Sequence, residues 1–129
     1  MIVDTSALIA IIFDESEASD LLAMLMTGEC RMSAATFFEA GMVIDRKAED
    51  AFPAKALEEL LALAEIEIVP FGDDQARLAR DAYAQFGKGR HLARLNFGDC
   101  FTYALAKETG EPLLFKGNDF SQTDIISAV

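Results

Sequence analysis

The sequence predicts an α/β protein in which a central parallel sheet of about five strands is flanked by helices. Short β-prone runs alternate along the chain with longer segments whose apolar residues recur at helical spacing. The 129 residues are 52% hydrophobic and 26% charged, and the three prolines are scattered. Such a chain forms one domain, residues 1–129, that can bury about two-thirds of its unfolded surface.

The first strand and helix place an acidic residue between them. Ile2-Val3 is the β-prone run, and apolar residues at helical spacing resume at Ala7. Asp4 then stands at the carboxyl end of a buried strand, the edge where open α/β sheets bind their ligands. The alternative is that Asp4 only caps the helix, since Asp is a good N-cap.

The alternation continues through the middle of the chain. The expected elements are a helix ending before Gly28, a strand at 30–32, a helix after Ser33, a helix from Pro53, a strand at 66–71 and a helix capped by Asp73. Glu39 falls in the second turn of the helix after Ser33, among apolar neighbours. A lone carboxylate there is costly unless it is paired, bound to a cation or turned outward to solvent.

The loop at 87–96 is the one evident basic segment of an acidic chain. Lys88, Arg90 and Arg94 lie in it, beside the only histidine, while the whole chain carries a net charge of −11. A general basic surface for nucleic acid is therefore excluded, and any such contact must come from a local patch or from bound metal. The loop is either a solvated segment or one that contacts phosphates.

Two more acidic positions follow in the last third. Asp99 lies at the start of a helix, where it either caps or serves a site. The strand at 112–115 runs directly into Lys116-Gly117-Asn118-Asp119. Asp4, Glu39, Asp99 and the Asn118-Asp119 pair thus occupy positions that a parallel sheet tends to bring to one edge.

Four clustered carboxylates repel one another, and each has a raised pKa unless a cation lies between them. Oxygen ligands without a nearby His or Cys set favour Mg²⁺ or Mn²⁺. Carboxylate-held ions of this kind activate water and neutralise the oxygens of a phosphoryl displacement. The acids therefore predict metal-dependent cleavage of a phosphodiester.

The cysteines and the apolar segments indicate where in the cell the protein is located. Cys30 and Cys100 have no metal-ligand spacing and form no disulfide framework, as in a reduced cytoplasmic protein. No signal peptide is recognisable, and the longest apolar run is too short to span a bilayer. We therefore expect a cytoplasmic location and no membrane contact.

Four sequence motifs together resemble those of the PIN domain, and more narrowly those of a VapC-type toxin ribonuclease of a bacterial toxin–antitoxin pair. They are Val3-Asp4-Thr5-Ser6-Ala7, the segment from Ser33 to Glu39, Leu95-Asn96-Phe97-Gly98-Asp99-Cys100, and Leu114-Phe115-Lys116-Gly117-Asn118-Asp119-Phe120. The resemblance spans the whole chain. It implies a PIN-like fold and an endoribonuclease that uses metal-activated water.

The resemblance also implies roles for individual residues. Asp4 and Asp99 would be the principal Mg²⁺ ligands, with Glu39 completing an acidic triad. Asp119 aligns best with the fourth acid, although Asn118 occupies a place that is often acidic in relatives. The hydroxyls of Thr5, Ser6 and Thr36 would orient carboxylates or water. The implied partners are RNA, a VapB-like antitoxin and a second copy of the chain.

Three other classes are weighed against this one. A phospho-accepting receiver domain needs an acid pair after the first strand, where Asp4 stands alone. A phosphatase with an Asp nucleophile needs a second Asp where Ser6 stands. A catalytically weak PIN-like binding module is disfavoured because all four acidic positions can be filled.

Overall fold

The computed structural model describes all residues, 1–129. The elements are β1 (Ile2–Val3), α1 (Thr5–Ile12), α2 (Ala18–Leu25), β2 (Arg31–Ser33), α3 (Ala34–Lys47), α4 (Phe52–Leu63), β3 (Glu67–Val69), α5 (Asp73–Phe86), α6 (Phe97–Thr109) and β4 (Leu113–Leu114). None of the helices is long and apolar enough to cross a membrane.

The strands form a single parallel sheet in the order β3-β2-β1-β4. The expected parallel sheet is confirmed, but it has four strands and not about five. Beyond β4 the chain adds only one isolated parallel bridge, between Leu113 and Ser127. Because a single bridge does not make a strand, the C-terminal segment extends the sheet without completing a fifth one.

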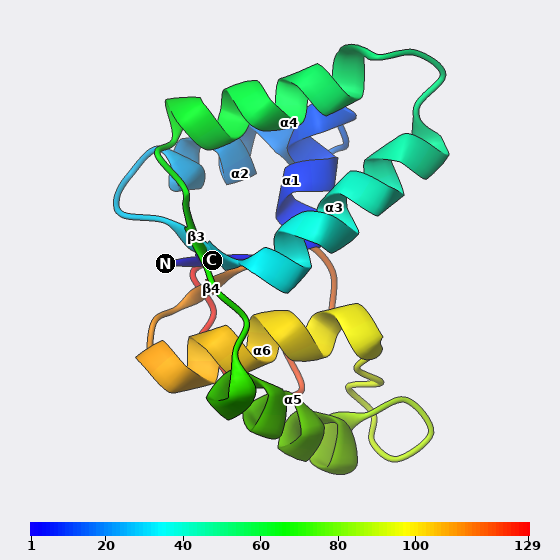
Figure 1. Cartoon of the computed structure of the whole chain (residues 1–129), viewed down its shortest axis with the longest axis vertical. Coiled ribbons are helices and arrows are strands. Elements are labelled where there is room, and N and C mark those ends of the chain that lie inside the picture. Colours follow the sequence, from blue (N-terminus) through cyan, green and yellow to red (C-terminus); the bar gives the residue numbers. More distant parts are fainter.

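Helices cover both faces of this sheet. In Figure 1, α1 to α4 lie on one side of the strands, and α5 and α6 lie on the other. The pleat of β1 explains the two cores, since successive strand residues point to opposite faces. Val3 joins the core beneath α1 to α4, while Ile2 joins the core beneath α5 and α6. Leu114 and Leu113 divide in the same way.

Local expectations hold with small corrections. Ser33 caps α3 as expected, its side chain accepting a hydrogen bond from the Ala35 N–H at 3.2 Å. Asp73 does not cap α5. Gly72 is the N-cap, and Asp73 is the first helical residue, where a carboxylate still interacts favourably with the helix dipole. Both cysteines are free, as predicted, and the structure places both in the interior.

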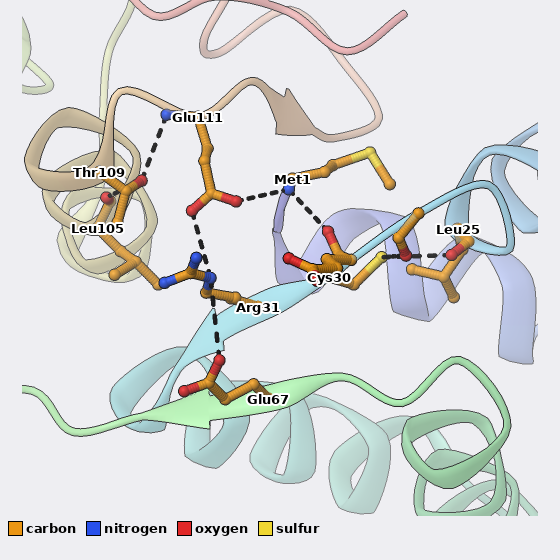
Figure 2. Close-up of polar contacts among 10 residues, drawn as sticks. Met1, Leu25, Cys30, Arg31, Glu67, Leu105, Thr109 and Glu111 are labelled. Carbon is orange, nitrogen blue, oxygen red and sulfur yellow. Dashed lines mark hydrogen bonds and ion pairs between the residues drawn. The ribbon is translucent and has the colours of Figure 1, made fainter.

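The amino-terminal edge of the sheet is a network of paired charges (Figure 2). The Met1 ammonium donates to Glu29 O and to Glu111 Oε1, both at 2.8 Å. Arg31 Nε lies 3.5 Å from Glu111 Oε2 and 3.9 Å from Glu67 Oε2. These contacts tie β1, β2 and β3 to the segment that leads into β4.

Candidate active site

Asp4 is held rigidly where β1 ends and α1 begins. Its Oδ2 accepts hydrogen bonds from the Ser6 N–H at 3.0 Å and the Ser6 hydroxyl at 2.6 Å. The Thr102 hydroxyl, from α6, donates to Oδ1 at 2.7 Å. Asp4 is only 4% exposed. It is the N-cap of α1, as the alternative interpretation held, and it also lines a cleft.

Glu39 reaches the same cleft from α3. The Thr5 hydroxyl donates to Glu39 Oε1 at 2.7 Å, so the side chain does not point away into solvent. Its other oxygen lies against Gly98. A Cβ added at Gly98 would come within 1.4 Å of Glu39 Oε2. Glycine at this position is what allows the carboxylate to lie beside the first turn of α6.

Asp99 completes the group from that first turn. Its Oδ2 accepts from the Asn96 N–H at 3.0 Å, and the Asp99 N–H donates to Asn96 Oδ1 at 2.9 Å. This reciprocal pair is a capping box. The side chain is buried at 9% exposure, and it also lines the cleft. Asp99 therefore caps its helix and belongs to the site.

The fourth acidic position is Asp119, in the loop after β4. Both Asn118 and Asp119 are exposed to solvent, but only Asp119 lines the cleft. The cleft has a volume of about 440 Å³ and collects residues from five segments of the chain. Its lining includes all four predicted acids, Asp4, Glu39, Asp99 and Asp119.

The acids affect one another electrostatically. Burial, together with the charges of Asp4, Asp119 and Glu39, raises the pKa of Asp99 to about 7, against the opposing hydrogen bond from Asn96. Burial and the Asp4 charge also raise the pKa of Glu39, although the Thr5 hydroxyl lowers it. The pKa of Asp119 is raised by burial and by Asp4. No cation compensates this group of carboxylates.

The one basic side chain that lines the cleft forms an ion pair with a fifth acid, Glu15. Lys116 lines the cleft, but its ammonium donates to Glu15 Oε1 at 2.7 Å. The Lys116 backbone N–H donates to the Ser6 hydroxyl at 3.0 Å, which links the loop after β4 to the Asp4 anchor. Lys116 thus fastens the wall of the cleft and leaves its acidic floor uncompensated.

The donors suit a hard divalent cation. They are oxygens, and Glu39 Oε2 and Asp99 Oδ1 receive no hydrogen bond from the chain. No three His, Cys, Asp or Glu side chains lie close enough together to hold one ion jointly. Mg²⁺ does not need three, because it keeps several waters and is commonly bound by one or two carboxylates together with substrate phosphates.

Three supporting residues were not predicted. Thr102 bonds Asp4 and lies 3.2 Å from the predicted Thr36 hydroxyl, forming a buried chain of hydroxyls. It stands one helical turn after Asp99, a spacing that puts both on one face of α6. The others are Asn96 and Gly98. Asn96 and Asp99 have the three-residue spacing of a capping box, which is visible in the sequence.

The basic side chains of the loop at 87–96 do not line the acidic cleft. Lys88, Arg90 and Arg94 are exposed, and none of them forms an ion pair. Lys88 lines a separate groove beside α5 and α6. The predicted phosphate contacts of this loop stay a prediction.

Sequence comparisons agree with this geometry. A family model described as "PIN domain" matches residues 1–126. Ribonuclease VapC28 of Mycobacterium tuberculosis is 50% identical over 131 aligned positions, covering 100% of this chain and 98% of that protein.

Solved structures share the fold at low identity. The crystal structure of Mycobacterium tuberculosis VapC20, described as a Sarcin-Ricin loop cleaving toxin, superposes with a TM-score of 0.77 at 15% identity, covering 97% of this chain and 95% of that one. A chain of a toxin–antitoxin complex from Klebsiella pneumoniae has a TM-score of 0.70 at 17% identity, covering 99% and 97%. The chain therefore belongs to the PIN domain family and is one of its VapC members.

Proposed function

We propose that the protein is an endoribonuclease, the toxin of a type II toxin–antitoxin pair, which hydrolyses RNA phosphodiester bonds in a divalent metal-dependent reaction. One observation carries this proposal. Five carboxylates line one cleft: Lys116 pairs with Glu15, but no cation compensates the other four, Asp4, Glu39, Asp99 and Asp119. Burial and mutual repulsion raise the pKa of Asp99 to about 7. Relatives named as VapC ribonucleases along the full chain support the same activity.

Asp4 and Asp99 would hold Mg²⁺ or Mn²⁺, with Glu39 and Asp119 beside them. When bound, the ion supplies an activated water and neutralises charge on the phosphate oxygens. The chain's own part is positioning. Ser6 and Thr102 fix both oxygens of Asp4, and Thr5 fixes one oxygen of Glu39. Hydrogen bonds of this kind hold ligating carboxylates in one orientation.

Protonation of Asp99 opposes cation binding in the metal-free site. With a pKa of about 7, Asp99 carries its proton for a large part of the time near neutral pH. Asp99 would have to lose that proton to hold a cation, so cation binding should release protons and weaken as the pH falls. RNA alone would be repelled by the acids, and we therefore expect metal to precede or accompany it.

The test is RNA cleavage by purified protein with Mg²⁺, with Mn²⁺ and with excess chelator. We expect cleavage with either ion and none with chelator, restored when the ion is returned. Cleavage that continues unchanged in chelator would contradict the metal-dependent mechanism. Binding of RNA without cleavage under all conditions would favour the binding-module alternative.

We further propose a VapB-like antitoxin and a second copy of the chain as protein partners, in the cytoplasm. A toxin–antitoxin complex among the structural neighbours supports the first. The net charge of −11 favours an antitoxin with a basic segment. Co-expression with the adjacent short reading frame, followed by measurement of the mass of the complex, tests both partners.

A further inference from the structure

A second cavity lies next to the acidic cleft and has the opposite character. It has a volume of about 780 Å³ and lies among α5, α6 and the start of α3. Its walls carry four aromatic rings and two cations: Phe71, Tyr83, Phe97, Phe101, Arg80 and Lys88. We call it the aromatic groove. No acidic residue lines it, in a chain with 22 acidic residues.

Three of these rings form an edge-to-face row that ends in solvent. Phe101 packs edge to face against Phe71 at 4.9 Å and against Phe97 at 4.7 Å between ring centroids. Phe97 itself is 80% exposed. The inner rings hold the outer one in place, so Phe97 offers a positioned and accessible aromatic surface.

Four of the six basic residues that form no ion pair gather on the same side; the other two, Arg46 and Lys55, lie on α3 and α4. Of the 11 basic residues, Arg31, Lys47, Arg77, Lys107 and Lys116 are in ion pairs. Arg80 and Lys88 are unpaired at the groove, and Arg90 and Arg94 are unpaired in the adjoining loop. This part of the surface therefore has cations available for an anionic ligand.

The groove and the acidic cleft are adjacent. Asn96 lines both cavities. Phe97 follows it directly, and Asp99 lies two residues further along the same helix. A polymer that threads from one cavity to the other would pass Asn96.

We propose that the aromatic groove binds an unpaired base of the RNA beside the scissile phosphate, with Phe97 stacking on the base and Lys88 and Arg80 contacting the flanking phosphates. This inference rests on the proposed ribonuclease function. Aromatic stacking combined with cationic side chains is how proteins bind single-stranded nucleic acid. An antitoxin with a basic segment does not suit a groove whose only charges are positive.

The chain has no tryptophan, so Phe97→Trp introduces a single tryptophan whose fluorescence can be followed. In an Asp4→Asn background that prevents cleavage, short single-stranded RNA of one repeated base should quench its fluorescence saturably. A duplex of the same length should quench it much less. Phe52→Trp is the matched control, because Phe52 is 70% exposed on α4, on the opposite side of the sheet (Figure 1).

Affinity gives a second measurement. Phe97→Ala should weaken single-strand binding by about 5- to 150-fold, the equivalent of about 1–3 kcal/mol for one stacked base. Phe97→Tyr, which keeps an aromatic ring, should bind single-stranded RNA with wild-type affinity. Lys88→Ala should lower the salt dependence by about 0.7 per lost phosphate contact, whereas the unpaired Lys55→Ala on α4 should not change it.

Two results would overturn the proposal. One is equal RNA affinity for Phe97→Ala and wild type, with no quenching of Phe97→Trp. The other is a Phe97→Ala variant that loses self-association but binds RNA normally, which would make the groove an interface between copies. Wild-type cleavage assays with metal separate these results from failure of the ribonuclease proposal, which would appear as no cleavage by the wild-type protein.

Discussion

Carboxylates at the two ends of the parallel strands have opposite electrostatic surroundings. At the amino ends of the strands, Glu111 lies beside two cations, the Met1 ammonium and the Arg31 guanidinium (Figure 2). Burial acts to raise the pKa of Glu111, but the hydrogen bond and charge of the Met1 ammonium and the charge of Arg31 lower it overall. At the carboxyl ends, Asp99 is also partly desolvated but faces other carboxylates, and its pKa rises to about 7.

The difference separates a structural role from a functional one. Paired charges at the amino ends favour the folded state without any ligand. The acids at the carboxyl ends oppose folding until a cation reaches them, and natural proteins retain such unfavourable groups where a ligand compensates them. One substitution, from acid to amide, should therefore have opposite effects at the two ends.

The largest expected effect is on cleavage. Asp99→Asn keeps the size of the side chain and an oxygen that can accept from the Asn96 N–H, but it removes the charge. We expect RNA cleavage to fall roughly a thousandfold or more, as for loss of a central catalytic group, while the protein stays folded. Asp74→Asn, an exposed acid on α5, is the control and should cut RNA normally. Normal activity of Asp99→Asn would reduce Asp99 to a helix cap.

The second expected effect is a pH dependence of the free energy of unfolding of the metal-free protein. The pKa of Asp99 is about 7 in the folded protein and 3.8 for the ordinary side chain, so the folded state binds the proton more tightly. The free energy of unfolding in chelator should therefore fall as the pH rises from about 4 to about 7, by up to about 4 kcal/mol. Urea unfolding across this range measures it. Asp99→Asn should flatten the decrease, and an equally steep decrease in the variant would assign it to other groups.

A third variant tests the position of the Glu39 carboxylate without changing any charge. Gly98→Ala places a methyl group where Glu39 Oε2 lies, so the carboxylate has to move. We expect cleavage to fall about 10- to 100-fold, with the free energy of unfolding changed by less than about 1 kcal/mol.

Gly41→Ala provides the matched control on α3. An added Cβ there meets nothing within 4 Å, so activity should be kept and the helix stabilised by up to about 1 kcal/mol. If both alanine variants cleave RNA like wild type, the position of Glu39 beside Gly98 has no part in the reaction.

The smallest effect should come from the amino ends. Glu111→Gln removes the charge that pairs with Met1 and Arg31, and it should destabilise the protein by about 1 kcal/mol at neutral pH. Because the folded-state pKa of Glu111 is lowered, this loss should disappear as the pH falls below that pKa. Glu67→Gln, whose partner Arg31 lies 3.9 Å away at an exposed site, should change stability less. Stabilisation by Glu111→Gln would remove the contrast between the two ends.

Much of the fold was predictable because its causes are local. Alternation of β-prone and helical segments predicted the parallel sheet, and Ser33 and Asn96 have the residue type and spacing of helix caps. The number of strands was overestimated because the last pairing, at Ser127, is a single bridge with no apolar run of its own. The sequence did not predict which helices pack on the same face of the sheet, because that depends on how the chain crosses between strands and not on local residue patterns.

The order of the acids along the chain was determined by the sequence alone, and so was their place after strands or in the first two turns of helices. Only the tertiary structure decided how they are held. Thr102 donates to Asp4 across 98 residues, and Lys116 pairs with Glu15 across 101. It also decided that Asp119, and not Asn118, lines the cleft. Such contacts depend on the packing of distant segments, because a side chain's partner is set by where the folded backbone brings it and not by its neighbours in sequence.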